Sequence, residues 1–102
     1  MKFEKGKIDG DFSIDEDFQL NGMINGRVNV KLGGRFFLNG MVNGGLTVEQ
    51  DGHAEIRGML IGDADNIGGT LKVYGVVQGT VRGPSASTYI DPKAVVGSKE
   101  IA

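Results

Sequence analysis

Glycine recurs along this chain at a nearly constant interval, and this interval restricts the folds that the chain can adopt. Beginning at Gly6, equivalent glycines are separated by 16, 18, 18 and 17 residues. Residues 18–35 and 36–53 are identical at nine of eighteen positions. An internal repeat of this length is typical of folds that stack one structural unit on the next.

Within each repeat, apolar and polar residues alternate along nearly the whole segment. Such alternation places the two sets on opposite faces of an extended strand. One residue is missing near residues 66–69 relative to the earlier repeats, so the apolar set moves there from even to odd numbers. The expected inward side chains are Phe18, Leu20, Ile24, Val28, Val30, Leu32, Phe36, Leu38, Val42, Leu46, Val48, Ala54, Ile56, Leu60, Ala64, Leu71, Val73, Val77 and Val81.

The Asn-Gly pairs could also indicate a meander of hairpins, since this dipeptide is a strong hairpin signal. The pairs at Asn21 and Asn25 leave only Met23 and Ile24 between them, too few residues for a strand that pairs with its neighbours. We therefore expect each pair to mark a corner, where one residue takes a positive φ. A helical fold is disfavoured, because 18 of the 102 residues are glycine and Asn, Val and Thr are frequent.

These observations predict an all-β fold, a single-stranded parallel β-helix of about six coils with 16–18 residues each. One coil means one lap of the chain around the helix axis. The whole chain, 1–102, is expected to form one domain, with regular coils over about 3–83 and a weaker last coil and tail over 84–102.

The composition excludes several classes of function. The chain has no cysteine, so disulfides, thiolate zinc sites and a cysteine nucleophile are impossible. Eleven Lys and Arg against thirteen Asp and Glu give a net charge of −2, which argues against a nucleic-acid partner. There is no signal-peptide pattern and no apolar run approaching the roughly 20 residues of a membrane span. We expect a cytoplasmic protein without a cofactor.

Two weaker motifs point to chemistry that we do not expect here. His53 is the only candidate general base, and the apolar i, i+6 spacing also fits a left-handed hexapeptide β-helix, whose acyltransferases use a histidine. No carboxylate is evidently placed to orient His53, so we expect no enzyme. The segment 63–69 resembles a calcium loop, but Ile67 and Tyr74 stand where ligands are needed, so we expect no metal.

The repeated pattern Gly-x-apolar-x-Gly-x-apolar resembles the bactofilin domain over about residues 3–83. The residues that carry this resemblance are Gly6, Ile8, Gly10, Phe12, Gly22, Ile24, Gly26, Val28, Gly40, Val42, Gly44, Leu46, Gly75, Val77, Gly79 and Val81. The resemblance implies a right-handed triangular β-helix that polymerises end to end without nucleotide as a bacterial cytoskeletal scaffold. Bactofilins usually carry disordered, often proline-rich tails beside this domain, whereas nearly all of this chain belongs to the repeats.

Candidate functional residues lie on the flanks and ends of the expected rod, since the inward set is ordinary core. Apolar side chains that face outward on successive coils form a patch of the kind that binds partners. The candidate lateral residues are Met23, Met41, Met59, Val76, Phe37 and Ile61, and the candidate end residues are Phe3, Glu4, Ile90 and Val95. The expected partner is another copy of the chain.

An alternative is a capped β-helix of viral or accessory origin that forms a homo-oligomer or binds a host protein through its lateral row. The terminal coils are polar, with Glu4 and Glu16 at inward positions, which would suit capped ends. The lateral residues could also lie half-buried at corners and have no partner.

Overall fold

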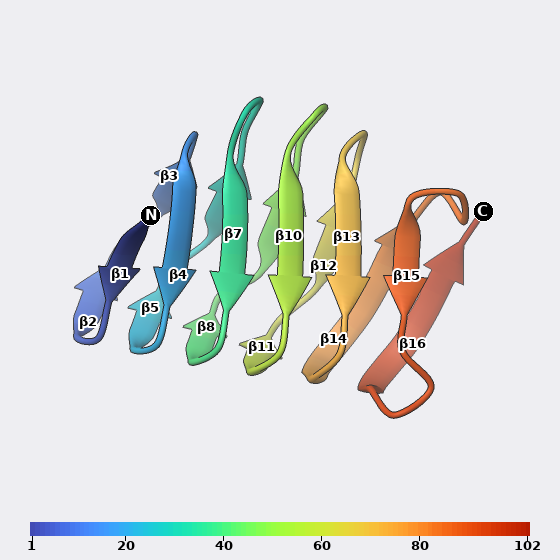
Figure 1. Ribbon diagram of the computed structural model, residues 1–102. Coiled ribbons are helices and arrows are strands. Elements are labelled where there is room, and N and C mark those ends of the chain that lie inside the picture. The colour runs from blue at the N-terminus through green and yellow to red at the C-terminus, as the bar shows by residue number, and fades with distance from the viewer.

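The computed structural model describes residues 1–102 and contains strands but no helix. The chain winds six times around one axis, and each lap lays three short segments along the sides of a triangle (Figure 1). The strands are β1 (Lys2–Glu4), β2 (Lys7–Asp9), β3 (Phe12–Ile14), β4 (Asp17–Leu20), β5 (Met23–Asn25), β6 (Val28–Val30), β7 (Arg35–Leu38), β8 (Met41–Asn43), β9 (Leu46–Val48), β10 (His53–Ile56), β11 (Met59–Ile61), β12 (Ala64–Asn66), β13 (Thr70–Val73), β14 (Val76–Gly83), β15 (Thr88–Ile90) and β16 (Val95–Ile101).

All strand pairs are parallel and join one coil to the next, which confirms the predicted β-helix. One side of the triangle is the six-stranded sheet β1-β4-β7-β10-β13-β15. The other two sides form a ten-stranded sheet that ends at β2 and β3, because β14 continues round a corner and joins both sides. In Figure 1 the front strands run downward and the rear strands upward as the chain advances from left to right, so the helix is right-handed.

The axis is filled by stacked apolar columns in the predicted register. Phe18 pairs with Phe36, which pairs with Ala54, which pairs with Leu71. The core contains nineteen buried hydrophobic residues, and every expected inward residue except Leu32 is among them. Because each coil buries its apolar face only against its neighbours, the stability of this fold comes from contacts between coils.

Leu32 was wrongly predicted to face inward; its side chain is 70 % exposed. It follows β6 in the loop 31–34, where the chain bulges away from the axis before β7 begins. Alternation predicts whether a side chain points inward or outward only while the backbone stays extended.

The Asn-Gly pairs lie at corners, where an added Cβ would overlap the backbone of the coil below, but only the second corner also requires a positive φ. Gly26 and Gly44 have φ values of 155° and 150°, which side chains with a Cβ rarely adopt. Gly22 and Gly40 have no positive φ, and the overlap alone requires glycine there: a Cβ at Gly40 would meet the carbonyl oxygen of Gly22 in the coil below. The predicted positive φ is therefore correct at the second corner, at Gly26 and Gly44, and wrong at the first, at Gly22 and Gly40.

The loop 67–69 is one residue shorter than the equivalent loops of the earlier coils, and hydrogen bonds from Asn66 close it. Its buried amide Nδ2 donates to Thr88 Oγ1 at 3.0 Å, and its Oδ1 accepts from the Gly69 backbone N–H at 2.9 Å. No buried side-chain polar atom in the structure lacks a hydrogen-bond partner. The shorter loop is thus closed without an unsatisfied polar group, which would cost about 1–3 kcal/mol.

Candidate interaction surfaces

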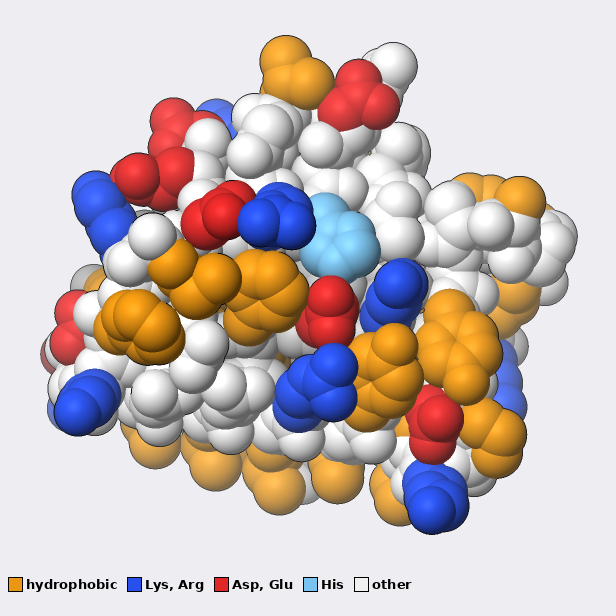
Figure 2. Space-filling view, viewed as in Figure 1, with side chains coloured by type: hydrophobic (Ala, Val, Ile, Leu, Met, Phe, Trp, Pro, Cys, Tyr) orange, Lys and Arg blue, Asp and Glu red, His pale blue; other side chains and the backbone are white.

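The predicted methionine row exists as a column on the outside of the rod. Backbone register aligns Lys7, Met23, Met41, Met59, Val76 and Val95 in successive coils. The three methionines and Val76 are half-buried, while Val95 in the last coil is 63 % exposed. Figure 2 shows a row of hydrophobic side chains along the lower edge of the molecule, the edge on which β5, β8 and β11 lie in Figure 1.

The other two lateral candidates do not extend this column into one patch. Ile61 lies on β11, two residues beyond Met59, in register with Asn43. Phe37 belongs to the six-stranded sheet, on another side of the triangle, in register with Gln19 and Glu55. The guanidinium of Arg35 lies 5.8 Å from the centre of the Phe37 ring. The structure therefore separates Phe37 from the methionines.

The six-stranded sheet carries a charged cluster around the single histidine, seen near the centre of Figure 2 in pale blue. His53 Nε2 lies 3.1 Å from Glu55 Oε2, and Arg57 donates to Glu55 Oε1 at 3.0 Å. Burial raises the pKa of Glu55, but the hydrogen bonds from His53 and Arg57 outweigh it and hold that pKa below its ordinary value. Arg57 also stacks 4.6 Å from the centre of the Tyr74 ring.

Glu55, the partner of His53, was not predicted from the sequence. Their i, i+2 spacing on an alternating strand puts both side chains on the same outer face, so the strand pattern could have found the pair. The pair lies on a sheet face among Phe37, Arg57 and Lys72, and none of the three cavities in the structure includes His53.

The remaining side of the triangle is covered by ion pairs. Arg82 donates to Asp63 and Asp65 at 3.1 Å each, and Arg27 reaches Asp65 at 3.5 Å. A hydrogen bond from the Thr80 backbone N–H and the contact with Arg82 lower the pKa of Asp63. The carboxylates of the calcium-like segment are therefore engaged by arginines, and no group of three or more His, Cys, Asp or Glu side chains could hold a metal ion.

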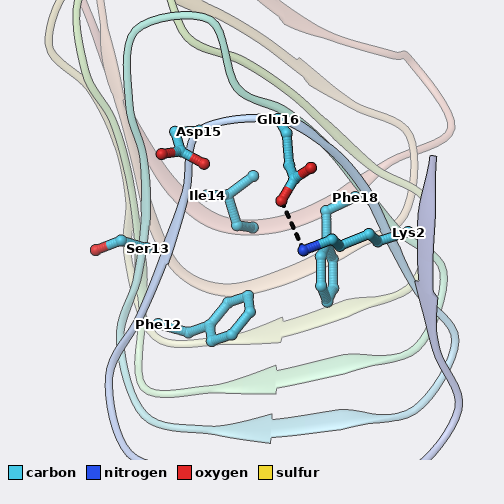
Figure 3. Close-up of a pocket in the computed structure, with 7 residues that line it drawn as sticks. All are labelled: Lys2, Phe12, Ser13, Ile14, Asp15, Glu16 and Phe18. Carbon is cyan, nitrogen blue, oxygen red and sulfur yellow. Dashed lines mark ion pairs between the residues drawn. The ribbon is translucent and has the colours of Figure 1, made fainter.

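The N-terminal end of the rod is an open mouth into the core (Figure 3). Phe12 and Phe18 lie with ring centres 5.1 Å apart, at a cavity of about 90 Å³. The side chain of Lys2 extends across this mouth, and its Nζ lies 2.8 Å from Glu16 Oε2. Glu4 stands in the inward column of Leu20 and accepts a hydrogen bond from the Gly6 backbone N–H. Charged groups thus lie above an apolar core.

The C-terminal end consists of β15 and β16, whose outer edges have no partner strand. Ile90 and Val96 are partly buried against the core, while Tyr89 is 46 % exposed. Lys99 stands in the inward column of Val81 and is exposed. The predicted end residues therefore occupy the two terminal coils, with Phe3 and Glu4 at one end and Ile90 and Val95 at the other.

Comparison of the chain with protein-family models, with curated proteins and with solved structures finds no match. The structure contains no helix of the length and apolarity needed to cross a membrane. Functional interpretation therefore depends on the geometry of the flanks and ends.

Proposed function

We propose that this protein is a non-enzymatic cytoplasmic scaffold that assembles end to end into a filament without nucleotide, as its resemblance to bactofilins implies. A rod of six stacked coils presents two different ends, and a contact between unlike surfaces that does not close into a ring produces an open polymer.

The observation that supports this proposal most directly is the state of the two ends. The edges of β1, β2 and β3 at one end, and of β15 and β16 at the other, have no partner strand. Unpaired edges are templates for another chain, and monomeric β proteins usually cover them. Five of the seven exposed large hydrophobic residues lie in the first or last coil: Met1, Phe3, Tyr89, Val95 and Ile101. Stacking of two rods would cover part of Phe3, Tyr89 and Val95, because the equivalent outward residues inside the rod, such as Phe37 and Met59, are half-buried between coils.

Replacing Phe3 by Glu is expected to impair assembly and leave the monomer intact. Phe3 is 60 % exposed, so the fold does not need its ring, but assembly would place the new carboxylate at the junction. We expect the protein concentration at which light scattering rises to increase at least about tenfold, which corresponds to about 1.4 kcal/mol. Electron microscopy would show fewer or no filaments at the original concentration.

The matched control is Leu32→Glu, the same kind of change at a residue that is 70 % exposed on the flank of the rod. It should leave both the scattering and the melting temperature near those of the unmodified protein. Uniform small particles of the unmodified protein at high concentration and low salt would contradict the proposal.

A second candidate function is a capped binding module that uses the methionine column. The Lys2–Glu16 ion pair across the N-terminal mouth and the inward Lys99 favour it, because charges at an edge discourage further pairing. Methionine suits an interaction surface because its flexible thioether adapts to the partner.

The double variant Met41→Glu with Met59→Glu separates the two candidates. A binding module would lose its oligomeric mass in light scattering, since two adjacent carboxylates would lie in the contact, while circular dichroism stays unchanged. An end-to-end filament would form as before. Asn43→Glu, an exposed position on the same strand as Met41, is the control for added charge alone.

A further inference from the structure

We propose that Met23, Met41 and Met59 bind one soft monovalent metal ion, Cu(I), on the outer flank of the rod. The three residues stand at the same outward position of three successive strands, β5, β8 and β11, and are direct register partners. Thioether sulfur is a soft ligand that selects Cu(I) over hard divalent ions such as Mg²⁺ and Ca²⁺. The expectation that the chain holds no metal concerned carboxylate, histidine and cysteine ligands, which are a different class. This site is independent of the proposed assembly.

The spacing of the strands suits an ion shared between neighbouring coils. Outward side chains of one column repeat at the distance between neighbouring strands, about 4.7–4.9 Å. A bond from sulfur to a first-row metal such as zinc is about 2.3 Å long, so one ion holds two sulfur atoms up to about 4.6 Å apart. Met23 and Met59 lie two coils apart, about 9.6 Å, so both must bend toward Met41 to share the ion. Their three rotatable bonds permit this, and Met41 is the central ligand.

Packing alone does not explain why methionine occupies this column in three successive coils. Val76 and Val95 stand at the same position in the last two coils. A β-branched residue, which strands favour, therefore fits the position. The three methionines are only half-buried, and Figure 2 shows a row of hydrophobic side chains along this edge of the molecule. A ligand can thus reach the column from solvent, and the property that methionine adds over valine is its sulfur atom.

The groups around the column favour a soft ion over a hard one. The other outward residues of β5, β8 and β11 are Asn25, Asn43 and Ile61, so these three strands present no carboxylate on this side. The carboxylate of Asp9, in the first coil, is engaged by Asn25 and Lys7. Hard cations need several oxygen ligands, which are absent from these strands, whereas Cu(I) is satisfied by sulfur. The chain has no cysteine that would compete for the ion.

Nuclear magnetic resonance of the methionine methyl groups tests the site in dilute protein, with Ag(I) as a soft monovalent probe that air does not oxidise. Silver nitrate is added in chloride-free buffer. We expect the methyl signals of Met23, Met41 and Met59 to shift together and to stop shifting at one ion per chain. Met1, which is 60 % exposed at the N-terminal end, serves as the internal control and should not shift at that ratio. Cu(I) kept reduced by ascorbate should reproduce the shifts, and zinc nitrate should cause none.

Met41→Leu and Met23→Leu distinguish a shared site from three separate sulfur atoms. Leucine keeps the volume of methionine, so circular dichroism should stay unchanged. Loss of a group that only orients a ligand costs about 10–100-fold in metal affinity, so loss of the central ligand should cost at least about 100-fold. Met23→Leu should cost less, because Met41 and Met59 remain neighbours. Equal effects of the two variants, shifts of all four methyl groups without saturation, or no response to Cu(I) would overturn the proposal.

Discussion

Replacing Val42 by Asp is expected to unfold the protein. Val42 lies on β8 with no solvent exposure, stacked between Ile24 in the coil below and Leu60 in the coil above. A carboxylate at this position has no partner, and its desolvation would cost at least about 4 kcal/mol. A domain of this size has a total stability of about 5–15 kcal/mol, so this single change removes a large part of it. Ile24→Asp should act in the same way.

Thermal melting followed by circular dichroism measures the effect, with Asn43→Asp as the control. Asn43 is the next residue on β8, but it is exposed on the outer face. The control adds the same charge to the same strand and should melt near the unmodified protein. If Val42→Asp also melted near the unmodified protein, Val42 could not be in the core, and the assignment of the inward residues of β8 would be wrong.

The architecture was predictable because two periodicities of the sequence agree with each other. The repeat of 16–18 residues requires equivalent residues to stack, and the alternation of two says which of them face the axis. Together they predicted the columns from Phe18 to Leu71 and from Leu20 to Val73, because every coil repeats the same path. A parallel stack leaves little freedom of register, since a shift by one residue would turn the core outward.

The features that were not predicted are of two kinds. Some lie where the chain departs from the repeat, and others are contacts that depend on the length of a side chain. Leu32 has inward parity but belongs to a loop, so alternation no longer applied. Arg27 lies one repeat after Asp11, but its guanidinium reaches Thr47 and Asp65, and Asp11 instead accepts from the Arg27 backbone N–H. The length of a side chain decides such contacts, and column positions do not encode it.

The first-corner glycines give the second large prediction, that Gly40→Ala strongly destabilises the fold. The corner of each coil lies directly on the corner below, with the Met41 backbone N–H donating to the carbonyl of Gly22. A methyl group on Gly40 would overlap that same carbonyl oxygen. Backbone atoms cannot move aside as a flexible side chain can, so the coils must separate locally. We expect a loss of at least about 3 kcal/mol.

Gly6→Ala is the matched control, because Gly6 stands in the same corner column at the open N-terminal end. No coil lies below it, and the nearest atom to an added Cβ is the flexible Glu4 Oε2 at 3.1 Å. In dilute solution Gly6→Ala should melt near the unmodified protein, whereas Gly40→Ala should melt at least about 12 °C lower. Equal melting of the two variants would contradict the close stacking of corners. Since each interior corner has this geometry, glycine is required there by the neighbouring coil, and only the end coil is free of the requirement.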